Sequence, residues 1–524
     1  MKKKGPWKHL HFSVTSPRAL KKIALLVWLA AANPMMRVLL VLLPTARSFW
    51  LPAAGGSPRC VRMGVDQPPL VDKGVVTPSA CSREDGFDRL PSLAADQAPE
   101  ATLRTPADRL SGTDRPTVWS EFGQLAASTG AVNLGQGFPD WQPPAFVVEQ
   151  AQVALAEGFH QYTRPAGHPP LVEVLAERYS GHLGRHVDAM TEVATTVGAS
   201  QALYLTLQAH VNPGDEVVLL EPAFDLYYGQ VRLAGGKVVP VPLAVDDEAG
   251  RWRLDLAALE RACTSQTKLL VLNSPHNPTG TAFTAEEMEA IAAVVRAHPN
   301  LLVISDEVYK YTVYAEGAAH THFAALPGMF ERTVTLSSAG KTFSITGWQA
   351  GWCVGPERLI RPIQLLLPFV QFCVSTPVQN ALSRVLTLAD GPYEGHASYY
   401  EWLRAMYRHK REVLATGLRR AGMGVMAGQG GFFLMADTSA IAVPQRYLDE
   451  ATPAAPDGVT RDWAFCRWLA LEGGVIAIPS SPFYSGPNKA LASNYIRFAF
   501  CKSDDTLVEA CERIEKLIRS SADS

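Results

Sequence analysis

The sequence of 524 residues predicts an α/β fold, with a large domain built on a mainly parallel sheet and a smaller α+β domain after it. Two observations carry this prediction. From about Thr113 onward, short apolar runs typical of buried strands alternate with longer runs of helical spacing, which favours parallel strands covered by helices. Beyond about residue 394, this alternation gives way to a long helix, short hairpin-like strands and a final helix.

The first 112 residues differ from the rest. Residues 1–22 hold seven basic residues, residues 23–43 are apolar but contain a proline and an arginine, and no acidic residue precedes Asp66. A basic, then apolar, then small-residue stretch is typical of a targeting leader, so we expect residues 1–112 to be a leader and disordered segment directing the protein to an organelle, a mitochondrion or a plastid. Two alternatives stay open. Residues 23–43 are long enough to anchor the chain in a membrane, or the start codon is mis-assigned and the protein is cytoplasmic.

Charge and cysteine usage exclude several functions. Residues 66–524 hold 37 basic against 50 acidic residues, without a basic stripe, so we expect no nucleic-acid partner. The eight cysteines are scattered without CxxC spacing. This pattern fits unpaired thiols in a reducing compartment, and we expect neither a disulfide framework nor a metal site.

The elements of the large domain follow in order. The run TEVATTVG (191–198) is predicted as a strand ending at a glycine, and ASQALYLTLQAH (199–210) as a helix with an apolar face. In NPGD (212–215), proline and glycine stand where a tight turn needs them. The runs EVVLL (216–220) and KLLVLNS (268–274) follow as buried strands.

The run TAEEMEAIAAVVRAH (284–298) begins with a threonine cap and an acidic first turn, as a helix does. It is followed by the apolar strand LLVISDEVY (301–309), which runs into two carboxylates. In such sheets, ligands bind beyond the carboxyl ends of the strands. In the smaller domain we expect a helix over 394–421, strands over 430–436, 474–478 and 494–500, and a helix over 505–518.

Lys341 is the one formal charge between Thr333 and Pro356. Strand-like runs, TVTLSS and GWQAGWCVG, stand on either side of it. A lysine held between buried strands loses hydration, which lowers its pKa and makes it a nucleophile able to form a Schiff base. The alternative is a solvated turn lysine.

Several strand ends carry polar residues or aromatics that complement such a lysine. Ala199 and Ser200 stand at a helix N-terminus, where free N–H groups bind anions. Phe224 could stack on a flat ring or belong to the core. Asn277 can donate a hydrogen bond to a phenolate-like oxygen.

Asp306 follows four apolar residues, and a buried carboxylate is best explained by a cation facing it; the alternative is that it caps a turn. Tyr309 follows three residues later. Arg497, in the otherwise uncharged NYIRFAF, could bind a carboxylate bidentately or be an edge arginine reaching solvent. Together these residues describe pyridoxal 5′-phosphate (PLP) on Lys341, with Asp306 at its ring nitrogen.

From about Arg115 to Lys516, the chain resembles the class I/II aminotransferases of PLP fold type I, and within them the kynurenine aminotransferase group, also known as glutamine transaminase K and cysteine-S-conjugate β-lyase. The resemblance implies a seven-stranded sheet. It also implies an arm over 113–144 joining the small domain, a PLP-binding domain over 145–393 and a small domain over 394–524. The matching motifs are NLGQGFPD, QYT, NSPHNPTG, SDEVY, SAGKTFSITGW, QGGFFL, AIPSSPFYS and YIRFAF.

The resemblance also implies roles for single residues. Lys341 is the Schiff-base lysine and general base, and Asp306 is the partner of the pyridine nitrogen. Toward the cofactor, Asn277 and Tyr309 would contact the ring oxygen, Phe224 would stack on the ring, and the phosphate would be bound by Ala199, Ser200 and Ser338. Toward the substrate, the carboxylate would be bound by Gly137, Asn277 and Arg497. Trp119 and Tyr162 would line the pocket. Tyr162 is expected to enter from a partner subunit, which implies a homodimer with shared active sites.

Two positions depart from the family pattern. Gln349 stands where the family usually has lysine or arginine paired with the cofactor phosphate, which implies looser PLP binding. Ser200 stands where the animal enzymes have tyrosine, which leaves the pocket rim open to change.

We therefore expect a PLP-dependent aminotransferase that passes the amino group of an aromatic, sulfur or amide amino acid (kynurenine, glutamine, methionine or phenylalanine) to a 2-oxo acid by a ping-pong mechanism. Uncharged substrates are favoured because the expected lining is apolar or aromatic: Trp119, Phe138, Tyr162 and Phe483. Cysteine-S-conjugate β-lyase activity at the same site stays an alternative. A non-catalytic PLP-binding regulator is a remote one, because the N-terminal segment shows no helix-turn-helix pattern.

Overall fold

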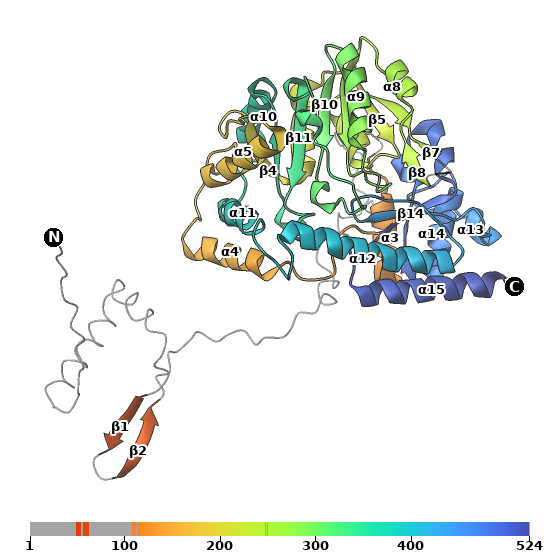
Figure 1. Cartoon of the computed structure of the whole chain (residues 1–524). Helices are drawn as coiled ribbons and strands as arrows, with labels where there is room; N and C mark the ends of the chain where they lie inside the picture. The colour runs from red at the N-terminus through yellow and green to blue at the C-terminus, as the bar shows by residue number, and fades with distance from the viewer. Residues whose placement is uncertain are drawn as a thin grey trace, which may run out of the picture. The chain divides into compact units, whose positions relative to one another are not determined.

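The computed structural model describes residues 49–53, 56–61, 107–111, 113–246, 248 and 250–522. The chain divides into two units, Met1–Thr77 and Pro78–Ser524. In the first unit, Phe49–Ala53 (β1) pairs antiparallel with Gly56–Val61 (β2) (Figure 1). Most of the predicted leader, including all of residues 23–43, lies outside the described residues. None of the described helices combines the length and apolar character that a membrane crossing needs.

A mixed, mostly parallel sheet forms the centre of the second unit. Among the described residues it has seven strands in the order β4-β12-β11-β10-β9-β5-β6, and β12 alone of them runs antiparallel to its neighbours. This confirms the predicted α/β class and the mainly parallel sheet. The strands are Val193–Val197 (β4), Glu216–Glu221 (β5), Lys237–Pro242 (β6), Thr267–Asn273 (β9), Leu302–Asp306 (β10), Thr333–Ser338 (β11) and Ala350–Val354 (β12).

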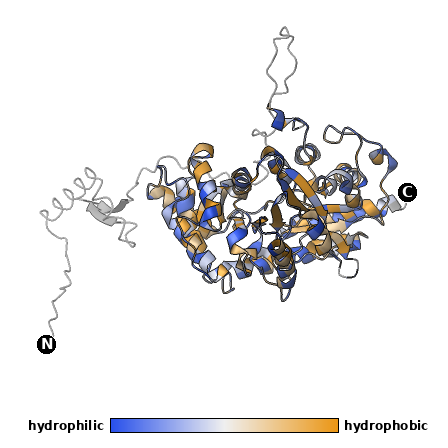
Figure 2. Cartoon of the chain, turned by 90° about the horizontal axis from the view of Figure 1, so that it is seen from above, coloured by the Kyte–Doolittle hydropathy of each residue, from blue (hydrophilic) through white to orange (hydrophobic). Residues whose placement is uncertain are grey.

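Helices cover both faces of this sheet, as the apolar strands require (Figures 1 and 2). Alternate strand residues enter different cores. Leu219 packs in the core that also contains residues of α6, α7 and α10, whereas Val218 packs in the core with residues of α8 and α9. The helices of this domain are Ala145–Ala156 (α4), Pro169–Leu183 (α5), Gly198–His210 (α6), Leu226–Leu233 (α7), Leu256–Ala262 (α8), Ala285–Ala297 (α9), Glu357–Val370 (α10) and Thr376–Leu388 (α11).

Local signals explain where helix α9 begins and where strand β10 ends. Thr284 caps α9 through a capping box with Glu287, as its sequence predicts. Strand β10 ends at Asp306, earlier than the predicted 309, because residues 307–312 turn into a short 3₁₀ helix, Lys310–Thr312. Asp306 therefore lies at the carboxyl end of a buried strand.

The remaining elements form the smaller α+β part. The predicted helix from 394 begins only at Tyr399, capped by Ser398, and the predicted strand 474–478 is two short strands with different partners. An antiparallel sheet has the order β13-β14-β17-β16. The elements are Tyr399–Arg420 (α12), Gly424–Val425 (β13), Phe433–Asp437 (β14), Gln445–Leu448 (α13), Arg461–Leu471 (α14), Val475–Ile476 (β15), Ile478–Pro479 (β16), Tyr495–Ala499 (β17) and Asp504–Ala522 (α15).

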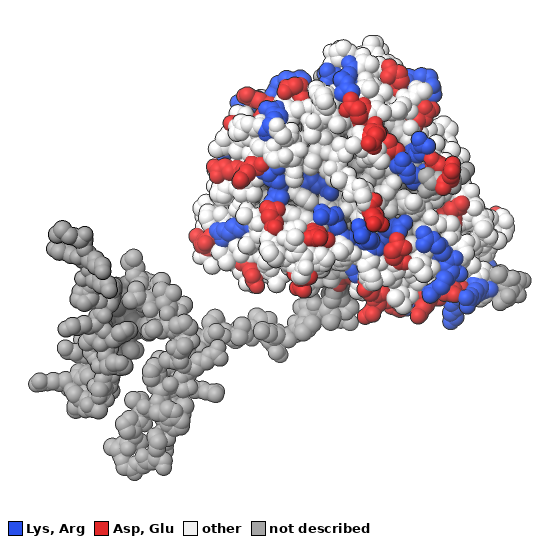
Figure 3. Space-filling model, viewed as in Figure 1, with Lys and Arg blue, Asp and Glu red and all other residues white. Residues whose placement is uncertain are grey.

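The segment 113–144 lies against this smaller part. Its helix Val118–Thr129 (α3) packs on α14, and Val132–Asn133 (β3) pairs in parallel with β15. A separate antiparallel pair, Ala244–Asp246 (β7) and Arg251–Arg253 (β8), lies beyond β6 in the chain. The predicted domain boundaries stay predictions. On the face drawn in Figure 3, acidic and basic side chains are interspersed.

Candidate active site

A cavity of about 480 Å³ lies where the carboxyl ends of the sheet strands meet the segment 113–144 and the smaller domain. Of the residues predicted for the site, Tyr162 and Phe483 do not line it. The predicted residues that do are Trp119, Gly137, Phe138, Ala199, Ser200, Phe224, Asn277, Asp306, Tyr309, Ser338, Lys341, Gln349 and Arg497. The fold thus brings together residues as far apart in the sequence as Trp119 and Arg497.

Lys341 lies just after β11 and points into this cavity. Its Nζ donates a hydrogen bond to the carbonyl oxygen of Gly137 at 3.1 Å and lies 5.5 Å from the centre of the Phe432 ring. Burial lowers the pKa of Lys341 below the ordinary lysine value. The structure therefore excludes the interpretation of Lys341 as a solvated turn lysine.

Asp306 is only 9% exposed, at the end of β10. Its Oδ2 accepts a hydrogen bond from the Tyr227 hydroxyl at 2.7 Å, and its Oδ1 accepts one from the backbone N–H of Val308 at 3.3 Å. Burial raises the pKa of Asp306, whereas the hydrogen bond from Tyr227 acts in the opposite direction. This carboxylate has polar partners and faces a cavity large enough to admit a cationic group.

Arg497 is almost fully buried in β17, so it is not an edge arginine. One terminal nitrogen donates to Asn277 Oδ1 at 2.9 Å and the other to the carbonyl oxygen of Gly135 at 2.8 Å, while Nε has no hydrogen-bond partner. The guanidinium lies 4.1 Å from the centre of the Phe433 ring. Burial lowers the pKa of Arg497 to about 10, which leaves it cationic at neutral pH.

The N-terminus of α6 forms another part of the cavity wall. Gly198 has φ +70° and Gly351 of β12 packs directly against it: a Cβ on Gly351 would lie 2.4 Å from the Gly198 carbonyl carbon and 2.6 Å from Ala199 N. The N–H groups that begin a helix of 13 residues point into an anion-binding position. Gln349 also lines the cavity, but its amide nitrogen donates to the Thr346 carbonyl at 2.6 Å.

Residues 129–514 match the family model described as aminotransferase class I and II. The chain belongs to this family. The kynurenine–oxoglutarate transaminase of Dictyostelium discoideum is 43% identical to it over 416 residues, which cover 77% of this chain and 94% of that one. Kynurenine–oxoglutarate transaminase 1 of Rattus norvegicus is 38% identical over 424 residues, covering 79% and 98%.

Solved structures show the same fold. N-succinyldiaminopimelate aminotransferase of Mycobacterium tuberculosis aligns with a TM-score of 0.70 at 38% identity, covering 79% of this chain and all of that one. The methionine aminotransferase YbdL of Escherichia coli aligns with a TM-score of 0.70 at 32% identity, covering 79% and 99%. The protein is thus an enzyme of the aminotransferase type, with the fold of PLP-dependent relatives.

The family implies PLP, and the residues of this aminotransferase fit it. PLP needs an amine, an acid for its ring nitrogen and an anion site for its phosphate. Lys341, Asp306 and the N-terminus of α6 supply these groups around one cavity. The orphaned Nε of Arg497 leaves a donor for a further anion, such as a substrate carboxylate.

The other predicted residues take clear positions. Trp119 donates from Nε1 to Asp225 Oδ2 at 2.6 Å, which fixes its indole beside Phe224. Gly137 passes under Phe433, since a Cβ there would lie 2.5 Å from that ring. Tyr162 is 80% exposed and contacts Phe372 at 4.8 Å between ring centres, outside the cavity.

One predicted lining residue is wrong. Phe483 is fully buried and does not line the cavity; it packs behind Trp119, with 6.3 Å between the ring centres, and beside Arg497. Phe138 does line the cavity and is 45% exposed. Phe483 therefore supports the wall of the site without forming it.

Sequence reasoning missed several residues that line or orient the site. Tyr227, in the first turn of α7, donates its hydroxyl to Asp306, and its sequence position gave no signal of this role. Asn273 belongs to the motif NSPHNPTG, but the motif alone gives it no role. It donates to the Asp306 carbonyl at 3.0 Å and accepts from the Asn277 backbone N–H at 2.7 Å, and so joins two strand ends.

Proposed function

We propose that this aminotransferase binds PLP at Lys341 and transfers the amino group of an uncharged aromatic, sulfur or amide amino acid to a 2-oxo acid by a ping-pong mechanism. The observation that carries the proposal is the meeting of Lys341, Asp306 and Arg497 in one cavity with an anion-binding helix N-terminus. Each of these side chains is held by contacts that the fold supplies before any ligand arrives.

The roles follow from chemistry and position. When bound, PLP supplies the electron sink that makes the substrate Cα proton acidic. Asp306, as an anion beside the ring nitrogen, favours a proton there. Lys341, whose burial lowers its pKa, takes the proton from the substrate Cα and returns it as a general base and acid. Arg497 orients the substrate by binding its carboxylate.

The charge of the lining argues for the substrate class. Among the described residues that line the cavity, the cationic ones are Lys341 and Arg497. An amino donor with a short side-chain carboxylate, such as aspartate, would place that charge in this lining without a further cation, which is costly. The rest of the lining includes Trp119, Phe138 and Phe433, which suit apolar and aromatic side chains. The names of the relatives, kynurenine–oxoglutarate transaminase and methionine aminotransferase, support the same class.

A half-reaction panel tests this proposal. The purified, PLP-loaded protein is mixed with single amino acids, and the change in the visible spectrum is followed. We expect kynurenine, methionine, phenylalanine and glutamine to react at least tenfold faster than aspartate. Aspartate as the fastest donor would contradict the proposal. A cysteine S-conjugate in the same panel, with pyruvate measured, reports on β-lyase activity.

We further propose that the enzyme acts as a homodimer in which Tyr162 of the partner subunit lines the cavity. The exposure of Tyr162, outside its own cavity and against Phe372, supports this. Phe369, which is 89% exposed on α10, is a second large apolar side chain of the kind that protein interfaces bury. An organellar location, through cleavage of a leader within residues 1–112, stays a proposal supported by composition alone.

A further inference from the structure

Three side chains that the amino-transfer chemistry does not use gather beside the site. Glu307 follows Asp306 at the end of β10, and His320 and His322 belong to the segment before a short 3₁₀ helix, Phe323–Ala325. We call them the Glu307 cluster. Because successive side chains of an extended chain point to opposite sides, Glu307 points away from the cavity that Asp306 lines.

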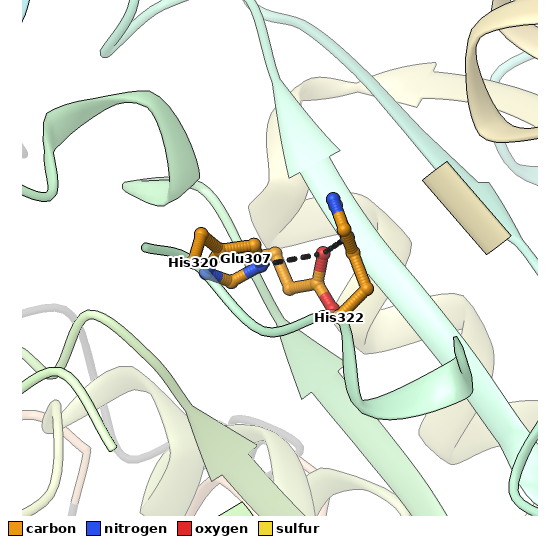
Figure 4. A group of neighbouring side chains, drawn as sticks. All are labelled: Glu307, His320 and His322. Carbon is orange, nitrogen blue, oxygen red and sulfur yellow. Dashed lines mark hydrogen bonds and ion pairs between the residues drawn. The ribbon is translucent and has the colours of Figure 1, made fainter. Parts of the chain in front are cut away.

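The two imidazoles converge on one carboxylate oxygen. His322 Nδ1 lies 2.6 Å and His320 Nε2 3.1 Å from Glu307 Oε2, and the three ligand atoms lie within 4.8 Å of one another. Figure 4 shows the rings on either side of the carboxylate. The other oxygen, Oε1, accepts a hydrogen bond from Ser305 Oγ at 3.0 Å, which fixes the orientation of the carboxylate.

One nitrogen of the cluster is left unsatisfied. His320 Nε2 is buried and lies 3.1 Å from Glu307 Oε2, yet it makes no hydrogen bond of acceptable geometry to any described residue. The His320 side chain is 9% exposed and that of His322 is 12% exposed. A buried ring nitrogen that lies close to an anionic oxygen without a hydrogen bond to it has a lone pair available for a metal ion.

The charges around the cluster fit a divalent ion. The cluster offers two imidazole nitrogens and one carboxylate within reach of one another, which are the donor types that such an ion binds. The neighbouring cation, Lys310, donates from Nζ to the Tyr179 hydroxyl at 2.8 Å.

A further ring fixes the position of one ligand. His182 stacks on His322 with 4.6 Å between the ring centres and 22° between the planes. Two imidazoles and a carboxylate are a common ligand set for first-row transition ions, with water completing the coordination. We propose that Glu307, His320 and His322 bind one divalent ion of this class, tested as Zn²⁺.

The bound ion would tie two chain segments together. The histidines follow the exposed residues 316–319, and Glu307 adjoins Asp306. The ion would therefore hold this segment to the end of β10 and stiffen the backbone that positions Asp306. This is a structural site, and it does not depend on the proposed amino-transfer function.

Metal titration of the intact enzyme tests the site. The PLP-loaded protein is dialysed against a chelator and then titrated with Zn²⁺, or with Co²⁺ as a coloured probe, without amino acid present. Metal content by mass spectrometry and the Co²⁺ visible spectrum give stoichiometry and Kd, while PLP absorbance shows that the fold is intact. We expect one ion per chain, with Kd raised at least tenfold in His320→Gln and in Glu307→Gln.

The control variant changes a histidine that pairs with a glutamate elsewhere on the protein, outside the Glu307 cluster. His298 Nε2 lies 3.2 Å from Glu260 Oε1 on the surface, and His298→Gln should leave Kd and stoichiometry unchanged. Wild-type protein that takes up no Zn²⁺ or Co²⁺ at micromolar concentration overturns the proposal. So does an unchanged Kd in His320→Gln. If both cluster variants fail to fold, a wild-type Co²⁺ spectrum without imidazole coordination overturns it.

Discussion

Gln349 is one of the two positions at which the sequence is expected to depart from the family pattern. It stands at the phosphate end of the cavity, and its amide nitrogen already donates to the Thr346 carbonyl. Lys341 and Arg497, the cations of the described lining, have other roles. In the proposed function, backbone N–H groups and hydroxyls would therefore bind the cofactor phosphate without a dedicated cation.

Replacing Gln349 with lysine should tighten PLP binding. A charge-assisted hydrogen bond contributes on the order of 1 kcal/mol or more beyond a neutral one, so we expect Kd for PLP to fall about fivefold to tenfold. Titration of the apoenzyme, followed by fluorescence, measures it. Gln349→Met, which adds no charge, is the control and should not tighten binding. An unchanged Kd in Gln349→Lys would show that the missing cation has no consequence.

Lys310 gives stability a defined pH dependence. It is 5% exposed, and burial lowers its pKa from 10.5 to about 7. Between these values the unfolded chain keeps the proton that the folded chain has released. The free energy of unfolding therefore rises with pH in this window, by up to about 1.4 kcal/mol per pH unit.

Urea unfolding at pH 7 and pH 9 measures this effect. Lys310→Met keeps the aliphatic stem and removes the titrating group, so we expect the gain in stability between the two pH values to be smaller in the variant. Equal gains in both proteins would mean that Lys310 keeps an ordinary pKa in the folded state.

At the scale of elements, the contact between β12 and the N-terminus of α6 builds the anion site. Gly351 is needed there because the chains approach too closely for a Cβ. A Cβ on Gly347, in the same GWQAGW run, would have no neighbouring atom within 4 Å, so this glycine serves as the matched control. Close packing of the two elements, rather than any charged residue, holds the N–H groups in place.

Gly351→Ala should displace the start of α6. We expect a loss of about 1–3 kcal/mol in the free energy of unfolding, as for other overpacked sites, together with weaker PLP binding. Gly347→Ala should change neither quantity by a comparable amount. Denaturant unfolding and PLP titration measure both, and equal behaviour of the two variants would contradict the packing account.

The sequence predicted the elements that local pattern specifies and missed those that depend on distant partners. The strand ends carrying Asp306 and Lys341 follow from apolar runs and a single charge. The run 474–478 has the pattern of one strand, but Val475–Ile476 pairs with the segment 113–144 whereas Ile478–Pro479 pairs with β17. Helix α10 contains Pro362 and Pro368, which obscure a helical pattern that packing sustains.

The residues that line the site were largely predictable from the sequence, whereas those that orient the lining residues were not. Motif resemblance supplied residues that face the cavity, but it did not show which aromatics stand behind the wall, as Phe483 does. Nor did it supply the side chains that orient the acid. Tyr227 has the character of an ordinary core residue until its hydroxyl is placed against Asp306. His320 and His322 gave no recognisable metal spacing with Glu307.

At the scale of the whole molecule, two exposed aromatics predict a dimer: Phe369 near the end of α10 and Phe372 just after it. Phe369→Asp should convert a particle of twice the chain mass into a monomer and lower transaminase activity, because Tyr162 of the partner subunit would be lost from the cavity. Light scattering and activity at equal protein concentration measure this. Val508→Asp on α15, also an exposed apolar side chain, is the control and should stay dimeric. A wild-type monomer with full activity would contradict the shared site.

The central claim is that Lys341 carries the cofactor. The enzyme loaded with PLP is reduced with borohydride, digested and mapped by mass spectrometry, with Lys341→Ala treated in parallel. We expect the reduced cofactor on the peptide containing Lys341 and none on the variant. Label on a different lysine of the wild-type chain, or no label at all, would contradict the account.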